Sequence, residues 1–130
     1  MSTTDTKKIL VADDESHILH VVSLKLRNAG FQVITACDGQ EALELARQES
    51  PDLMIIDYQM PQLSGLELCS RLKQDAATSR IPAILLTARG YDLEPKDVEP
   101  NGIVRILSKP FSPRQLLATV NDILATELAA

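Results

Sequence analysis

The sequence predicts an α/β domain in which a five-stranded parallel sheet carries helices on both faces. Short aliphatic runs alternate along the chain with helix-length amphipathic segments, an order typical of strands joined by right-handed helical crossovers. The aliphatic runs are continuously apolar, which indicates strands that are buried on both faces. The length of 130 residues suits one domain with a substantial core.

The expected elements follow one another as strand, helix, strand from the N-terminus onwards. The strands are Lys8–Ala12, Gln32–Ala36, Leu53–Ile56, Ala83–Leu86 and Ile103–Leu107, and the helices are Ser16–Ala29, Gln40–Glu49, Gly65–Gln74 and Ser112–Leu128. The first helix ends at Gly30, a C-cap signal, and Asp38 is a suitable N-cap for the second. Ser112 can cap the last helix, and Pro113 suits its first position.

The segment Arg89–Asn101 departs from this alternation. A fourth helix is expected here, but Pro95 and Pro100 interrupt it. A helix can run only from about Pro95 to Glu99, and its many acidic residues leave almost no apolar stripe. We therefore expect a short or irregular fourth helix.

Composition excludes several classes of protein. The net charge is −5 and only 3% of the residues are aromatic, so neither a basic surface nor a base-stacking platform is available, and no nucleic-acid partner is expected. No run of apolar residues is long enough to span a membrane, so no membrane partner is expected either. The start lacks the apolar stretch of an export signal, which predicts a cytoplasmic protein. Residues 1–6 are expected to be a flexible leader and 7–130 the domain.

Two cysteines are too few for a disulfide framework. Cys37 ends the second strand, and Cys69 lies on the apolar side of the third helix. We expect both to be reduced and to act as small buried hydrophobic residues.

Polar side chains follow four of the expected strands. Asp13 and Asp14 come after the first strand, Asp57 after the third, Thr87 after the fourth and Lys109 after the fifth. Ligands of open parallel sheets bind outside the carboxyl ends of the strands, where these residues meet. The sequence therefore predicts three carboxylates, a hydroxyl and an ammonium at one edge of the sheet.

These carboxylates need cations near them. Two carboxylates about 4 Å apart repel each other by roughly 4 kcal/mol at an effective dielectric constant of 20. Lys109 supplies one positive charge, and we expect Mg²⁺ to supply the rest, because it prefers oxygen ligands. With this compensation one aspartate can act as a nucleophile towards phosphorus, and the product is an aspartyl phosphate.

In these residues the sequence resembles the receiver domains of two-component response regulators. The resemblance spans about Lys7 to Leu128 and rests on the order and spacing of Asp13-Asp14, the segment D-Y-Q-M-P-Q-L-S-G that begins at Asp57, Thr87-Ala88 and Lys109-Pro110-Phe111. It implies a flavodoxin-like three-layer sandwich with strand order 2-1-3-4-5. It also implies a cis peptide bond between Lys109 and Pro110.

The resemblance assigns a role to each residue. Asp57 is the phosphoacceptor; Asp13, Asp14, Asp57 and the backbone carbonyl of Gln59 hold Mg²⁺; Thr87 and Lys109 contact the phosphoryl group. The implied function is a stand-alone, phosphorylation-dependent switch that catalyses only its own phosphorylation and dephosphorylation. The implied donor is a histidine kinase or a histidine-phosphotransfer protein, which can dock on the first helix. The output is an unknown downstream protein.

Two alternatives and one departure stand beside this interpretation. A haloacid-dehalogenase-like phosphatase also uses a nucleophilic aspartate and Mg²⁺, but it requires an acid where this chain has Gln59. A nucleotide or flavin binder requires a phosphate loop where the acids Asp13 and Asp14 stand. The departure is Ile106, because receivers usually carry there an aromatic residue that reports phosphorylation.

Overall fold

The computed structural model describes residues 6–88, 93 and 98–129, and its centre is a five-stranded parallel sheet. The strands are β1 (Lys8–Ala12), β2 (Gln32–Ala36), β3 (Leu53–Asp57), β4 (Ala83–Thr87) and β5 (Ile103–Ser108). Their order in the sheet is β2-β1-β3-β4-β5, and every neighbouring pair is parallel. The predicted flavodoxin-like order is therefore confirmed, and each strand ends within one residue of its predicted end.

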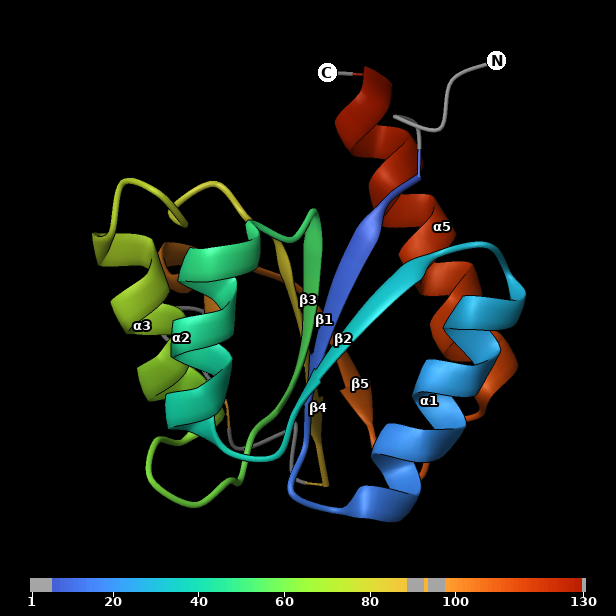
Figure 1. The fold of residues 1–130 in the computed structure, drawn as a ribbon, viewed down its shortest axis with the longest axis horizontal. Coiled ribbons are helices and arrows are strands. Elements are labelled where there is room, and N and C mark those ends of the chain that lie inside the picture. Colours follow the sequence, from blue (N-terminus) through green and yellow to red (C-terminus); the bar gives the residue numbers. More distant parts are fainter. Residues whose placement is uncertain (1–5, 89–92, 94–97, 130) are drawn as a thin grey trace.

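Helices cover both faces of the sheet (Figure 1). They are α1 (Ser16–Asn28), α2 (Gly39–Glu49), α3 (Gly65–Gln74) and α5 (Pro113–Ala129), with a short 3₁₀ helix η3 (Glu99–Asn101) before β5. One face carries α1 and α5, and the other carries α2 and α3 (Figure 1). The domain is thus the three-layer sandwich that the alternation of strands and helices predicts.

The core consists of two apolar clusters, one on each face of the sheet. Successive residues of a strand point to opposite faces, so neighbours such as Ile55 and Ile56 belong to different clusters. Ile55 packs in the cluster that includes Leu116 and Val120 of α5, whereas Ile56 packs with Leu68 of α3. The strands β1, β3 and β4 are buried almost throughout, which explains their continuous apolar runs. The expectation of burial on both faces is wrong for the edge strands β2 and β5, which are partly exposed because each pairs with a neighbour on one side only.

Side chains fix the beginnings of the helices. The Asp38 carboxylate accepts a hydrogen bond from the Glu41 N–H at 2.8 Å, and Ser112 Oγ accepts one from the Gln115 N–H at 2.9 Å. These are the N-caps expected from the sequence. Gly30 follows α1 with a φ of 99°, a conformation that favours glycine.

Two elements expected from the sequence lie largely outside the described residues. They are the helix of Pro95–Glu99 and the leader of residues 1–6.

The two cysteines differ in their burial. Cys69 is buried as expected, but the expectation for Cys37 is wrong, because this residue is exposed. Its backbone N–H and its Sγ both lie within hydrogen-bonding distance of Glu41 Oε1, at 2.8 and 3.3 Å, and this polar partner replaces apolar packing. Among the described residues, no helix combines the length and the apolar character that crossing a membrane requires.

Candidate functional site

The carboxyl ends of the strands meet at one edge of the sheet, at the bottom of Figure 1. Backbone hydrogen bonds between neighbouring strands continue into the first residues of the loops that follow. The Tyr58 N–H donates to the Leu86 carbonyl at 2.8 Å, and the Lys109 N–H donates to the Thr87 carbonyl at 2.8 Å. These bonds hold the residues on either side of the strand ends in register, so their side chains come from a rigid frame.

The loop after β3 is fixed by a close backbone approach at Gly65. The Gly65 N–H donates to the Tyr58 carbonyl at 2.8 Å. A Cβ atom at Gly65 would lie 2.6 Å from the carbonyl oxygen of Asp57, a distance that sterics forbid. The first residue of α3 therefore packs directly against the end of β3, which positions Asp57 without taking part in chemistry.

Lys109 brings three carboxylates together. Its Nζ lies 3.1 Å from Asp57 Oδ1, 3.4 Å from Asp13 Oδ2 and 3.1 Å from Glu15 Oε1. The Asp13 side chain is fully buried and that of Asp57 is 7% exposed, whereas that of Glu15 is 59% exposed. Lys109 is the last residue before Pro110, and the peptide bond between them is cis, as the resemblance implies.

The pKa values show that one ammonium does not compensate this cluster. Burial, followed by the negative charge of Asp13, raises the pKa of Asp57 from 3.8 to about 6. Burial also raises the pKa of Asp13. For Lys109 burial acts in the opposite direction, but hydrogen bonds to Asp57 and Glu15 outweigh it and raise the pKa. At the two aspartates, burial thus outweighs the stabilisation of the charged form that Lys109 provides.

The other predicted residues border the same hollow. It has a volume of about 310 Å³, and its lining includes Asp14, Asp57, Gln59, Thr87 and Lys109. Thr87 is buried and Gln59 is exposed, and the Gln59 N–H donates a hydrogen bond to the Asp57 carboxylate that lowers the pKa of this group. All six residues predicted from the sequence, the buried Asp13 included, therefore lie at one end of the sheet.

The donor atoms at this end fit a hard divalent cation. Carboxylate oxygens of Asp13, Asp14 and Asp57 lie within 4.8 Å of one another. Two of these aspartates are buried, and burial is the main cause that raises the pKa of each, so a cation bound beside them would favour their ionised forms. Oxygen-only donors of this kind suit Mg²⁺, which keeps several water ligands and needs few protein carboxylates.

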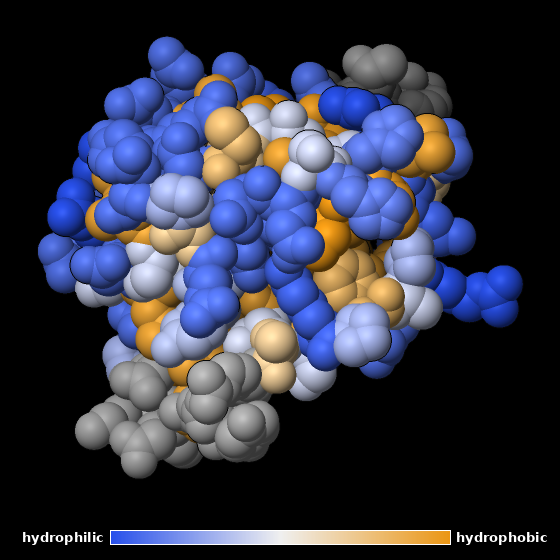
Figure 2. Space-filling view, turned by 90° about the horizontal axis from the view of Figure 1, so that it is seen from below, coloured by the Kyte–Doolittle hydropathy of each residue, from blue (hydrophilic) through white to orange (hydrophobic). Residues whose placement is uncertain are grey.

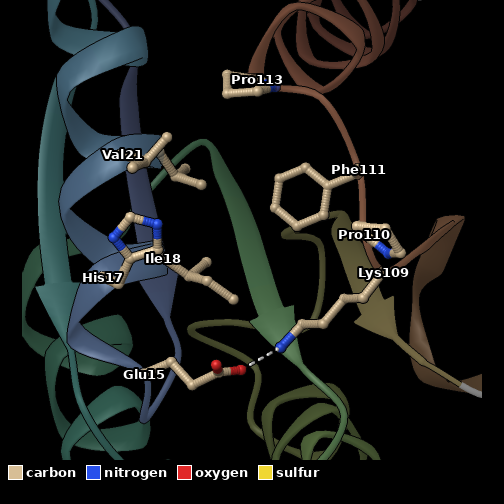
Figure 3. Close-up of a pocket in the computed structure, with 9 residues that line it drawn as sticks. Glu15, His17, Ile18, Val21, Lys109, Pro110, Phe111 and Pro113 are labelled. Carbon is tan, nitrogen blue, oxygen red and sulfur yellow. Dashed lines mark hydrogen bonds and ion pairs between the residues drawn. The ribbon is translucent and has the colours of Figure 1, made fainter.

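A second hollow adjoins the first. It has a volume of about 520 Å³ and lies between α1 and the segment that joins β5 to α5. Figure 3 shows Ile18 and Val21 of α1 facing Phe111 across it. Seen from the strand ends, hydrophilic residues cover most of the surface, and apolar residues show between them in several places (Figure 2).

Sequence reasoning missed Glu15 as a partner of Lys109. The signal was present, because Glu15 directly follows Asp13 and Asp14 and belongs to the same loop at the strand ends. The sequence could not show that its side chain turns towards Lys109, 94 residues away. The resemblance implied docking on the first helix, but it did not identify Phe111 as a residue that lines the same hollow.

Comparison with known proteins gives sequence relatives over nearly the whole chain. The chain is 41% identical over 125 residues to the alkaline phosphatase synthesis transcriptional regulatory protein PhoP of Bacillus subtilis, a match that covers 95% of this chain and 51% of PhoP. It is 37% identical to the phosphate regulon transcriptional regulatory protein PhoB of Pseudomonas aeruginosa, covering 91% of this chain and 52% of PhoB. The chain thus spans about half the length of these relatives.

Solved structures agree with the fold. The chemotaxis response regulator CheY4 of Vibrio cholerae superimposes with a TM-score of 0.84 at 32% identity, covering 91% of this chain and 98% of CheY4. The receiver domain of the sensor histidine kinase PA1611 from Pseudomonas aeruginosa, described with a magnesium ion coordinated in its active-site cleft, gives a TM-score of 0.81 at 25% identity and covers 90% and 96%.

The family comparison is consistent with both results. The family model described as "Response regulator receiver domain" matches residues 9–121. This match includes every residue of the predicted site and leaves the phosphatase alternative unsupported. The chain belongs to the response regulator receiver domain family.

Proposed function

We propose that this receiver domain accepts a phosphoryl group on Asp57 and acts as a switch through protein contacts. One observation carries the proposal: a nearly buried carboxylate at the central strand end contacts an ammonium, borders a polar hollow and has its pKa raised to about 6. A carboxylate whose charged form is disfavoured by burial and by a neighbouring carboxylate gains from a metal ion and from esterification, since both reduce its negative charge.

The proposed transfer starts from a phosphohistidine. An Asp57 oxygen attacks the phosphorus atom, the P–N bond to the imidazole breaks, and the imidazole leaves with a proton from solvent. The Lys109 ammonium and the Thr87 hydroxyl can reach the phosphoryl oxygens, because both groups border the same hollow. Water later attacks the same phosphorus atom and releases phosphate, which restores the carboxylate. In this proposal the chain catalyses only its own phosphorylation and dephosphorylation.

Mg²⁺ is the proposed cofactor. Asp13, Asp14 and Asp57 would hold it, with the backbone carbonyl of Gln59 as the fourth protein ligand that the resemblance implies. The magnesium ion described in the PA1611 receiver supports this assignment. When bound by these residues, the ion would supply positive charge to the phosphoryl oxygens and to the crowded carboxylates.

We further propose that a histidine kinase or a histidine-phosphotransfer protein docks in the apolar hollow beside α1. Glu15 and Lys109 line both this hollow and the one that contains Asp57. A partner seated against Ile18 and Phe111 can therefore present an imidazole directly to Asp57. A Val21→Asp variant should lose phosphotransfer from a phosphorylated histidine-phosphotransfer protein but keep labelling by phosphoramidate; loss of both, or of neither, contradicts the docking.

The phosphoacceptor is tested with a small phosphodonor. Wild-type protein incubated with acetyl phosphate and Mg²⁺ should gain one phosphoryl group by intact-mass spectrometry, and chelation of Mg²⁺ should prevent it. Asp57→Asn keeps the side-chain shape but removes the nucleophile, so it should gain none. Asp122→Asn, which changes an exposed acid on α5, is the matched control and should be labelled as wild type. Labelling of Asp57→Asn at another acid would overturn the assignment.

The output contacts involve the β4–β5 side of the domain in this proposal. Ile106, in the position where receivers usually carry an aromatic residue, is partly buried against the core cluster of the α2–α3 face, and Leu93 and Val98 also pack against this cluster. A β-branched side chain has a stiff χ1, so it cannot move in and out as an aromatic ring does. We therefore expect phosphorylation to change how Leu93, Val98 and Ile106 pack against the core cluster, rather than to rotate one aromatic ring.

A further inference from the structure

The ion pair between Glu15 and Lys109 stands between the two hollows of the strand-end surface. Glu15 and Lys109 line both of them, and their Oε1 and Nζ atoms lie 3.1 Å apart. Figure 3 shows this ion pair among the residues that line the apolar hollow. No other described residue is common to the two linings. Any group that reaches Asp57 from the apolar hollow therefore passes this pair.

The three donors of the Lys109 ammonium are already engaged. A lysine ammonium has three N–H groups, and Nζ contacts one oxygen each of Asp13, Asp57 and Glu15. To bind a phosphoryl oxygen in addition, the ammonium must give up or share one of these contacts. Which contact it gives up decides how strongly Lys109 can hold the new group.

Glu15 is the partner that is most easily released. The Asp13 and Asp57 side chains are 0% and 7% exposed, and separating a buried carboxylate from its cation is costly. The Glu15 side chain is 59% exposed, so water can replace Lys109 as its partner. Glu15 also stands at the N-cap of α1 without capping it, so the helix end does not hold its carboxylate.

We propose that Glu15 is a positioning residue that shares the Lys109 ammonium in the unphosphorylated protein and competes with the phosphoryl group for it. The proposal extends the function proposed above and depends on it. Release of Glu15 frees one N–H of Lys109, and the same step moves a negative charge away from the incoming phosphoryl oxygens. Glu15 thus lowers the affinity of the site for a phosphoryl group and biases the domain towards its unphosphorylated state.

Beryllofluoride, a phosphoryl mimic, tests the proposal without turnover. Its affinity at saturating Mg²⁺ is measured by amide NMR for wild type and for Glu15→Gln, which keeps the length of the side chain but loses the charge. The variant should bind roughly two- to fivefold more tightly, the range expected for release from an exposed ion pair. Glu44→Gln, which removes an exposed acid that lines a separate hollow on α2, should bind as wild type.

Two further measurements separate this contact from a general effect of charge or folding. Glu15→Asp keeps the charge, but aspartate favours capping a helix, so its carboxylate should turn from Lys109 to α1 and the mimic should again bind more tightly. In Mg²⁺-free protein, the side-chain NMR signals of Lys109 should shift in both Glu15 variants and stay unchanged in Glu44→Gln. A purely structural role of Glu15 would not move these signals selectively.

The outcomes distinguish this inference from the function on which it depends. Failure of wild type to bind beryllofluoride with Mg²⁺ would overturn the proposed phosphoacceptor function. Normal binding by wild type, together with equal or weaker binding by Glu15→Gln, would overturn only the role of Glu15. Equal tightening in Glu44→Gln, or a Glu15→Asp variant that behaves as wild type, would likewise overturn the positioning role.

Discussion

Replacing Asp57 by asparagine should stabilise the protein when no divalent cation is bound. Asp57 is nearly buried beside Asp13, and its pKa rises from 3.8 to about 6. At about 1.4 kcal/mol for each pH unit, ionising this group costs the folded protein about 3 kcal/mol at neutral pH. Asparagine removes the charge and keeps an oxygen that can accept from Lys109. We expect a gain of about 1 to 3 kcal/mol in the free energy of unfolding.

The stability difference between wild type and Asp57→Asn should depend on pH. Between about pH 4 and pH 6 the folded protein holds the Asp57 proton that the unfolded chain loses, so wild-type stability falls as pH rises through this window. The advantage of Asp57→Asn should therefore be absent near pH 4 and complete above about pH 6. Asp122→Asn, the control in an exposed ion pair, should change stability by less than about 0.5 kcal/mol.

Urea unfolding with EDTA, followed by circular dichroism across this pH range, measures both quantities. An Asp57→Asn variant no more stable than wild type at pH 7.5 would refute the electrostatic reasoning. An advantage of equal size at pH 4 and pH 7.5 would refute it as well, because the gain would then come from packing and not from charge.

Three further substitutions should change Mg²⁺ affinity or stability. Asp14→Ala should lower Mg²⁺ affinity by roughly tenfold or more, measured by isothermal titration calorimetry, and unchanged affinity would exclude Asp14 as a ligand. Gly65→Ala should cost about 2 kcal/mol or more of unfolding free energy, because its Cβ would lie 2.6 Å from the Asp57 carbonyl oxygen; a thermal midpoint equal to wild type would contradict this. Ser23→Ala should raise the free energy of unfolding by about 1 kcal/mol, because the buried Ser23 Oγ has no hydrogen-bond partner among the described residues, and a loss of stability would show that Oγ is satisfied.

The strands and the meeting of the site residues could be predicted from the sequence for a physical reason. A strand buried on both faces needs apolar residues at every position, so its boundary is where polar residues begin, as at Asp13 and Asp57. Parallel pairing then brings these boundaries to one edge, whatever the details of the loops. The helices were also predictable, because caps such as Asp38 act within a few residues of the chain.

The missed features depend on side-chain directions at the ends of loops. Whether Cys37 is buried is decided by Glu41, which accepts from its backbone and lies next to its thiol. Whether Glu15 caps α1 or pairs with Lys109 is decided by where β5 ends relative to β1, two strands that are not neighbours in the sheet. No local pattern carries this information. Sequence reasoning therefore found the groups that carry chemistry but not the residue that competes for Lys109.

The burial of Asp57 beside Asp13 explains both why its ionisation lowers the stability of the folded protein and why the site suits the proposed chemistry. An ordinary surface aspartate would stay ionised without cost and gain little from a cation, whereas Asp57 and Asp13 are held in a buried site with one shared ammonium. A ligand that binds only the folded state stabilises it in proportion to the logarithm of its concentration. Mg²⁺ should therefore raise wild-type stability more than that of Asp57→Asn, so the gap between the two proteins should close as the ion is added. If the gap stays unchanged instead, Asp57 holds no cation; if it widens, the ion binds the Asp57→Asn variant more tightly than wild type, and either result contradicts the proposed metal site.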